Sequence, residues 1–344
     1  MKKTLIALVV TAMAAASANA VVVYKNEGTK VELDGRGAFE IVNMKDKKVD
    51  TNGKRTDLVD RGSRVRVRAS QDIGNGFSAL AAFEIRFTQN GTVGDGINTK
   101  RLFGGFAHKD VGSLTFGRQL TLGDHIPKAN YSYELGGNVL HDNAPKAVHF
   151  MSNKFDGFRV AADYYFGEAD KTKADAGQGF GVGAFYDGKW GDVGVRFGSG
   201  YIEVKKADAV TKDYKQKIAG VGFDVKYKIV TVGFDWAHGT SMKGHSDYNF
   251  KHSMNAKYEK IDRFDLGLKV DLTEQNALYG AFLWGTGKNE GRANGKHRGW
   301  VMGVDHRFNK HVAVYLEGGK ANVKENGTKV SDAARIGLGT RIMF

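Results

Sequence analysis

The sequence predicts an all-β protein, a closed antiparallel β-barrel of sixteen strands that crosses a membrane. Apolar and polar residues alternate in segments of about ten residues, from Gly28 to the end of the chain. Aromatic residues recur near the ends of these segments, and the last segment finishes on Phe344. Alternation gives a strand one apolar face and one polar face. Apolar outer faces with aromatic residues at both interfaces are typical of barrels in membranes.

The composition excludes several other classes of protein. The chain has 344 residues, with 46 glycines, 2 prolines and no cysteine. Glycine is well above its usual share of about 7%, but there is no Gly-X-Y period, so the chain is not collagen-like. Few prolines and 11% aromatic residues argue against a disordered chain. The lack of cysteine removes disulfide scaffolds and thiolate chemistry, and a mean hydropathy of −0.39 excludes a bundle of membrane helices.

Residues 1–20 have the three parts of a secretory signal peptide. Lys2 and Lys3 form a positive start, an apolar stretch of about twelve residues follows, and residues 18–20 read Ala-Asn-Ala, a cleavage site. The apolar stretch is too short for a membrane helix, which needs about 20 residues. We therefore expect cleavage after Ala20 and a single barrel domain over residues 21–344. That domain carries 49 basic and 38 acidic side chains, a formal charge of +11.

The alternation locates the individual strands. In the segment near 258–272, for example, Phe264, Leu266 and Leu268 have one parity while Arg263 and Asp265 have the other. No window of comparable length shows a period of 3.6 residues. The predicted strands lie near 29–44, 61–73, 77–90, 100–109, 112–119, 145–153, 157–167, 179–187, 191–205, 214–227, 229–240, 258–272, 275–286, 297–308, 310–323 and 332–344.

A soluble β-sandwich also alternates, so three further features favour a membrane barrel. The polar parity is heavily charged on nearly every strand, as a water-filled interior allows. The C-terminal strand ends on its last aromatic residue. An open sheet edge in lipid leaves backbone groups unpaired, and barrels of sixteen to eighteen strands enclose an aqueous channel. The aromatic residues near strand ends include Tyr164, Phe166, Phe234, Trp236, Trp284 and Trp300.

One long segment, from Leu120 to Ala144, shows no alternation. A loop above about 15 residues is usually functional or disordered. This one contains Tyr131, Tyr133 and Leu135, which favours a packed loop. Other connections are short, as at residues 109–111, and alternate long loops and short turns are the layout of outer-membrane barrels.

Several motifs resemble those of the Gram-negative general porins. They are KVELDGRG at residues 30–37, DVGSLTFGRQ at 110–119, the strand ending in Phe344, and YELGGN at 133–138, which is similar to the porin motif P-E-F-G-G-D. The opening VVVYKNEGTKVELDGRG, with the signal peptide, is most similar to the major porins of Pasteurellaceae. The resemblance spans the mature chain. It implies a homotrimer of sixteen-stranded barrels, each with its third loop folded into the pore.

The resemblance also assigns residues to the narrowest part of the pore. The cationic wall of the family falls on Arg36 and Arg64, and a further wall cation falls on Lys100 or Arg101, between which the motif does not choose. By parity, the same face carries Arg66, Arg68 and Arg86.

On the loop, the acidic side falls on Glu134 and more loosely on Asp124. Three positions depart from the family pattern. Asn138 and Asn130 stand where the family has loop acids, and Met151 stands where it has another arginine. Opposed charges across a narrow pore orient dipolar solutes. Because two acids are missing, we expect a weak preference for anions. A solvated strand face is the alternative reading of the arginines, and backbone hydrogen bonding is the alternative for Glu134.

No residues predict a metal, a cofactor or a catalytic site. His238, His245 and His252 are scattered without metal-ligand spacing, and the glycines at 177–183 do not match GxGxxG. There is no G-x-S-x-G motif. The basic charge is spread over several loops, for example at Lys45 and Lys205, which argues against nucleic acid. We expect lipopolysaccharide and outer-membrane lipid as partners, and the barrel-assembly machinery as a partner of the strand that ends in Phe344.

The function expected from the sequence is passive diffusion of ions and small hydrophilic solutes through the outer membrane, without enzymatic activity. Two alternatives stay open. A substrate-specific channel would use loop aromatics, here Tyr131 and Tyr133. A surface adhesin or structural envelope protein would use the long loops.

Overall fold

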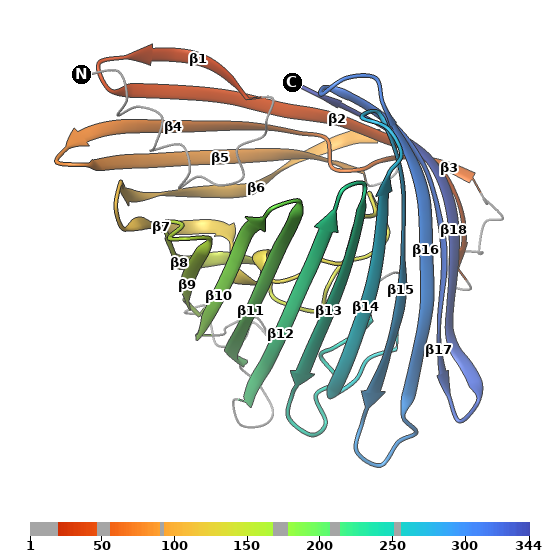
Figure 1. Ribbon diagram of the computed structural model, residues 1–344. Coiled ribbons are helices and arrows are strands. Elements are labelled where there is room, and N and C mark those ends of the chain that lie inside the picture. Colours follow the sequence, from red (N-terminus) through yellow and green to blue (C-terminus); the bar gives the residue numbers. More distant parts are fainter. Residues whose placement is uncertain (1–19, 47–55, 90–92, 168–177, 207–213, 251–255) are drawn as a thin grey trace.

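The chain folds into one antiparallel β-sheet that closes on itself (Figure 1). The computed structural model describes residues 20–46, 56–89, 93–167, 178–206, 214–250 and 256–344. The predicted all-β fold is confirmed. Residues 1–19 of the predicted signal peptide lie outside the described residues. In the described part of the chain, no helix is both long and apolar enough to span a membrane.

Sixteen strands form the closed barrel, as predicted. They are β2 (Thr29–Asp46), β4 (Arg64–Gly74), β5 (Phe77–Gln89), β6 (Val93–His108), β7 (Gly112–Leu120), β8 (Asn143–Ser152), β9 (Phe158–Tyr165), β10 (Gly179–Trp190), β11 (Val193–Lys206), β12 (Tyr214–Tyr227), β13 (Val230–Thr240), β14 (Lys260–Asp271), β15 (Asn276–Lys288), β16 (Gly295–Arg307), β17 (Val312–Glu325) and β18 (Thr328–Met343). The last strand, β18, pairs with β2 and closes the sheet. Backbone hydrogen bonds between Gly35 and Phe344, of 2.9 and 3.1 Å, complete this seam.

Two short strands were not predicted. β1 (Val21–Asn26) pairs with the start of β2, and β3 (Thr56–Asp60) pairs with its later half. The strand predicted at 61–73 is wrong at its start, because residues 61–63 form a break between β3 and β4. Gly62 has a φ of 80°, and the Asp60 carboxylate accepts the backbone N–H groups of Gly62 and Ser63 at 2.8 and 3.0 Å.

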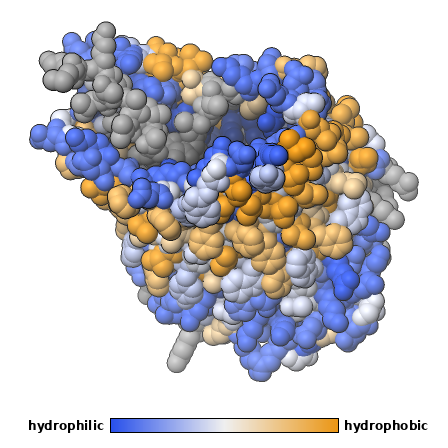
Figure 2. All heavy atoms as spheres, viewed as in Figure 1, coloured by the Kyte–Doolittle hydropathy of each residue, from blue (hydrophilic) through white to orange (hydrophobic). Residues whose placement is uncertain are grey.

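Apolar side chains cover the outside of the barrel. On β18, Leu338 is 56% exposed, whereas Glu317, on the inner face of the neighbouring β17, is 1% exposed. Hydrophobic residues gather across the middle of the face shown in Figure 2, between hydrophilic residues above and below. Such a band matches the hydrocarbon layer of a membrane. Phe234, Trp236 and Trp300 depart from the expected position near a strand end, since they lie near the middle of β13 and of β16.

The two ends of the barrel differ in the length of their connections. At one end, turns of two to five residues follow β1, β4, β6, β8, β10, β12, β14 and β16. Longer connections lie at the other end, including residues 121–142 between β7 and β8, and residues 241–259 between β13 and β14. This is the predicted alternation of short turns and long loops.

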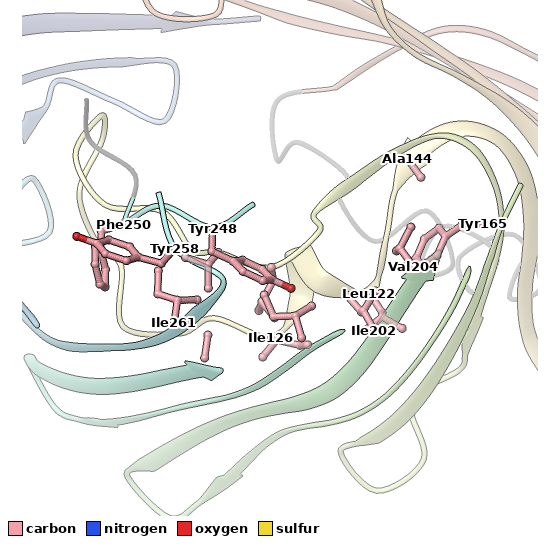
Figure 3. Close-up of a cluster of buried hydrophobic side chains, with 14 of the residues drawn as sticks. Leu122, Ile126, Ala144, Tyr165, Ile202, Val204, Tyr248, Phe250, Tyr258 and Ile261 are labelled. Atoms are coloured by element: carbon pink, nitrogen blue, oxygen red, sulfur yellow. The ribbon is translucent and has the colours of Figure 1, made fainter. Parts of the chain in front are cut away.

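An apolar core lies against the strands from β8 to β17 (Figure 3). Leu122 and Ile126, from residues 121–142, are buried beside Ile202 of β11. Phe250 and Tyr258, from the connection between β13 and β14, are also fully buried. The sequence analysis did not predict the packing of this second connection. The core therefore belongs to the loops and to one side of the barrel.

The outer face predicts how stability depends on depth in the membrane. We expect Leu338→Arg to lower the free energy of unfolding by about 2–4 kcal/mol, because it places a charge in the apolar band. Thr286→Arg is the matched control, since Thr286 faces outward near the long-loop end of β15 and should cost about 0–1 kcal/mol. Denaturant titration of the lipid-folded barrel measures both, and equal costs would contradict the assigned outer face.

Candidate functional site

The strand register brings the predicted wall arginines together on the inner face of β2, β4, β5 and β6. Arg36 pairs with Arg64, and Arg64 pairs with Arg86. In the adjacent row, Arg66 pairs with Glu84, which pairs with Arg101. Residues opposite each other in an antiparallel pair lie on the same face. We call the six residues Arg36, Arg64, Arg66, Arg68, Arg86 and Arg101 the arginine wall.

A fully buried carboxylate, that of Glu84, binds three arginines of this wall. Glu84 is 0% exposed and accepts Arg86 at 2.6 Å and Arg101 at 2.7 Å, with Arg64 at 3.6 Å. Arg36 instead donates to the backbone carbonyls of Arg61 and Gly62 at 2.9 and 3.1 Å. Three guanidinium groups around one carboxylate leave an excess of positive charge.

Two wall residues are more enclosed than an exposed pore lining would be. Arg66 is 9% exposed and Arg68 is 3% exposed. Both donate to the buried carboxylate of Asp34, at 2.9 and 3.0 Å. Asp34 lies on the polar parity of β2, but the parity alone did not identify it as their partner.

The structure distinguishes Lys100 from Arg101, which the sequence did not. The pairing of β5 with β6 shifts by one residue between Glu84 and Ile85, so that Glu84 pairs with Arg101 and Ile85 with Thr99. Lys100 is the extra residue of this β-bulge. Arg101 therefore belongs to the arginine wall.

Buried carboxylates on the inner wall bind the backbone of residues 121–142. Glu317 of β17 accepts the N–H groups of residues 133, 134 and 135, at 2.7, 3.1 and 2.7 Å. Asp235 of β13 accepts those of residues 128 and 129, at 2.6 and 2.9 Å. Asp163 of β9 accepts that of Leu122 at 2.9 Å. The sequence analysis missed these three acids, because their partners are backbone groups far away in the chain.

Inward-facing glycines leave room for the same segment. A Cβ atom at Gly267 would lie 1.9 Å from the carbonyl oxygen of Ala129, and one at Gly222 would lie 2.4 Å from that of Ile126. Further glycines that contact residues 121–142 in this way are Gly181, Gly183, Gly198, Gly200, Gly220 and Gly233. The high glycine content was the sequence signal for this close approach. The glycines on β10–β14 share the inward parity, and that pattern could have located the contact in the sequence.

Glu134, the predicted loop acid, forms an ion pair with Arg341 of β18 at 2.9 Å and lies 3.8 Å from Arg61. Burial raises the pKa of the Glu134 carboxyl above its ordinary value, while the hydrogen bond from Arg341 opposes that shift. Arg341 also lies 4.6 Å from the centre of the Tyr133 ring, which stacks on Tyr315. Glu134 is thus largely engaged with cations of the wall.

The remaining predicted loop positions have different roles. Asp124 is exposed in the short 3₁₀ helix η2 (Leu122–His125). The side chains of Asn130 and Asn138, which replace family acids, accept the N–H groups of Ser132 and Leu140 at 3.1 and 2.7 Å. They therefore stabilise turns within the segment.

The sequence analysis missed a further cationic group beside the wall. Arg61 donates to the fully buried Glu40 at 2.5 Å, and Arg335 of β18 bonds to the same carboxylate. Arg335 and Arg341 have the parity opposite to the outward Leu338, so alternation along the last strand could have identified them. At the end of that strand, Phe344 is 46% exposed, and its ring lies against Gly35.

The carboxylate contacts predict how residues 121–142 are held. Glu317→Gln replaces a charged acceptor of three N–H groups by a neutral one, and we expect amide exchange at residues 133–135 to become about tenfold faster or more. Hydrogen–deuterium exchange with mass spectrometry measures it. Asp305→Asn is the control, since Asp305 accepts the Tyr133 hydroxyl at 3.1 Å but none of these N–H groups. Unchanged exchange in Glu317→Gln would contradict the anchoring role.

Three kinds of comparison agree with this architecture. A family model described as Gram-negative porin matches residues 4–326. The major outer membrane protein of Pasteurella multocida is 35% identical over the whole length of both chains. Among solved structures, the anion-selective porin from Comamonas acidovorans has a TM-score of 0.70 at 17% identity, covering 92% of this chain and 100% of its own. OmpT of Vibrio cholerae, in a trimer form, has a TM-score of 0.69 at 17% identity, covering 92% and 100%.

The predicted family and location are therefore confirmed. The family model matches most of the chain, and the relative from Pasteurella multocida matches all of it. The solved porins share the closed barrel. A channel, rather than an enzyme, is what these relatives imply. The chain belongs to the Gram-negative porin family and forms a general diffusion channel in the outer membrane.

Proposed function

We propose that this porin favours anions over cations. One observation carries the proposal: arginines greatly outnumber carboxylates where the barrel wall faces Glu134. Arg36 has Arg341, Arg64, Glu134 and Arg86 as its electrostatic neighbours. The seven arginines of this neighbourhood are Arg36, Arg61, Arg64, Arg86, Arg101, Arg335 and Arg341. The acids near them are Glu40, Glu84 and Glu134, which form the ion pairs, and Asp124, a neighbour of Arg101.

The proposal treats residues 121–142 as an inward-folded third loop that narrows the channel. Its hydrogen bonds to acids on β9, β13 and β17 support this. Near Arg36 the loop brings little unpaired negative charge, because Glu134 is paired with Arg341 and Asn130 and Asn138 are neutral. Its acids Asp124 and Asp142 lie toward Arg101 and Lys100 instead. The field across the channel then comes mainly from the arginine wall. Charged side chains that line a pore set its selectivity.

Passive diffusion needs no chemical step. A hydrated anion enters at the long-loop end, where guanidinium groups lower its electrostatic energy, and leaves because no single group holds it tightly. The same positive potential raises the electrostatic energy of a cation. The mature charge of +11 adds to the attraction of anions.

We also propose three partners. A homotrimer is supported by the full-length relatedness to porins and by the fold shared with OmpT in its trimer form. Lipopolysaccharide is supported by the exposed Lys296, Arg298 and Lys320, which share the outward parity of Trp300 and Leu316. The barrel-assembly machinery is supported by the exposed Phe344 at the end of the closing strand.

Reversal potentials under a KCl gradient test the selectivity. We expect the wild-type channel to be more permeable to chloride than to potassium. Arg64→Glu should lower the chloride-to-potassium permeability ratio several-fold and Arg64→Gln less, because lumen charges tune selectivity. Arg298→Glu is the matched control, since it makes the same change on the outer face.

Two results would contradict the proposal: a wild-type reversal potential of the cation-selective sign, or equal ratios in Arg64→Glu and Arg298→Glu. Closure in three equal current steps in the same recordings is the result expected for a trimer. Single steps of closure would count against that assembly.

A further inference from the structure

A cavity adjoins the arginine wall on its short-turn side and shares Arg66, Arg68 and Arg101 with it. This cavity, of about 120 Å³, lies between the strands from β4 to β9 and the start of residues 121–142. Its apolar lining includes Phe103, Leu120 and Met151. Its charged lining includes Arg68, Arg101 and Arg159 together with the carboxylate of Glu84, which binds Arg101. The cavity thus combines flat apolar surfaces with guanidinium groups.

Three guanidinium groups of the lining have a nitrogen without a partner among the described residues. These nitrogens are the buried Nε atoms of Arg68, Arg101 and Arg159. The terminal nitrogens of Arg68 and Arg101 bind Asp34 and Glu84. A buried donor without a partner is unfavourable. These Nε atoms have almost no accessible surface, so an acceptor that enters from the channel meets the terminal guanidinium nitrogens instead. Those of Arg68 and Arg101 are already engaged, which leaves Arg159 as the available cation among these three.

Arg159 supplies the charge that is not balanced locally. Within the described ranges, no carboxylate forms an ion pair with it. His149 is held by Asp163 at 2.5 Å, and the His125 ring stacks on His149 at 6.4 Å. Burial lowers the pKa of His125 to about 4, so this ring is neutral at pH 7. The excess positive charge is therefore that of the guanidinium group.

A neighbouring cavity of about 290 Å³ shares His125, Met151 and Arg159 with the first. Arg159 follows the turn between β8 and β9, so the two cavities lie toward the short-turn end. Met151 is one of the positions where this chain departs from the porin pattern. A methionine there gives the site an apolar, polarisable surface in place of a further charge.

We propose that the cavity is a binding subsite for small aromatic carboxylates that pass through the channel. The carboxylate accepts hydrogen bonds from the terminal N–H groups of Arg159, and the ring packs on Phe103, Leu120 and Met151. The subsite deepens the proposed anion preference and rests on it, because a channel that admits anions lets such a solute reach the cavity. Inorganic anions gain the charge interaction alone and bind more weakly.

Fluorine NMR of 4-fluorobenzoate with the folded protein in detergent micelles tests the subsite. Protein-free micelles with the same detergent give the reference for partition into detergent. We expect saturable line broadening with the wild type, and at least tenfold weaker binding to Arg159→Gln. Arg307→Gln is the matched control, since it removes a cation beside Asp305 on the opposite wall, and binding should be unchanged.

Three further measurements separate the contributions of the charge and of the apolar lining. The neutral 4-fluorobenzyl alcohol should bind at least tenfold more weakly than 4-fluorobenzoate, and acetate should displace 4-fluorobenzoate poorly. Met151→Gln, which keeps the side-chain length, should weaken 4-fluorobenzoate severalfold. Circular dichroism of each variant establishes that the barrel is folded before binding is compared.

The outcomes separate this inference from the proposed selectivity. Equal binding of 4-fluorobenzoate to wild type and Arg159→Gln overturns the subsite, as does equal binding of the neutral alcohol. A cation-selective reversal potential with Arg159-dependent binding overturns the proposed selectivity alone. Anion selectivity without 4-fluorobenzoate binding overturns the subsite and leaves the selectivity standing.

Discussion

The bonds between buried carboxylates and the backbone of residues 121–142 are the interaction on which the interior depends. An irregular segment that packs against a barrel wall has N–H groups that neither a helix nor a sheet satisfies, and buried unpaired groups are costly. Glu317, Asp235 and Asp163 accept six of these N–H groups. Hydrogen bonds to an ionised acceptor are about twice as strong as neutral ones. The N–H groups in turn are hydrogen-bond partners for the three buried carboxylates, whose negative charges would be costly without partners.

The same contacts divide the interior into two sides. Glycines on β10–β14 let the backbone of the segment approach the wall, and Leu122 and Ile126 then pack into an apolar core. The connection between β13 and β14 adds Phe250 and Tyr258 to that core. The arginine wall lies on β2, β4, β5 and β6. One side of the barrel therefore holds the loops, and the other side presents charge.

On the charged side, a few acids hold many arginines in fixed positions. Glu84 orients three guanidinium groups, Asp34 orients two, and Glu40 orients two more. Planar guanidinium groups bind carboxylates in defined geometry, so the arginines are preorganised rather than spread by mutual repulsion. Glu84 is fully buried, whereas Arg64, Arg86 and Arg101 are partly exposed. This arrangement keeps the positive field on the solute side.

The sequence by itself determined the strands, their two faces and the positions of the long loops, because alternation with period two is a local property that side-chain chemistry enforces at each residue. Parity also placed Arg64, Arg66 and Arg86 on the inner face. The tertiary structure alone decided which charges meet: Glu317 is more than 180 residues from Tyr133, and Glu40 is 295 residues from Arg335. It also decided the β-bulge that selects Arg101, and the break at Gly62 that positions Arg61. Such contacts depend on barrel closure, register and loop path, which no local pattern encodes.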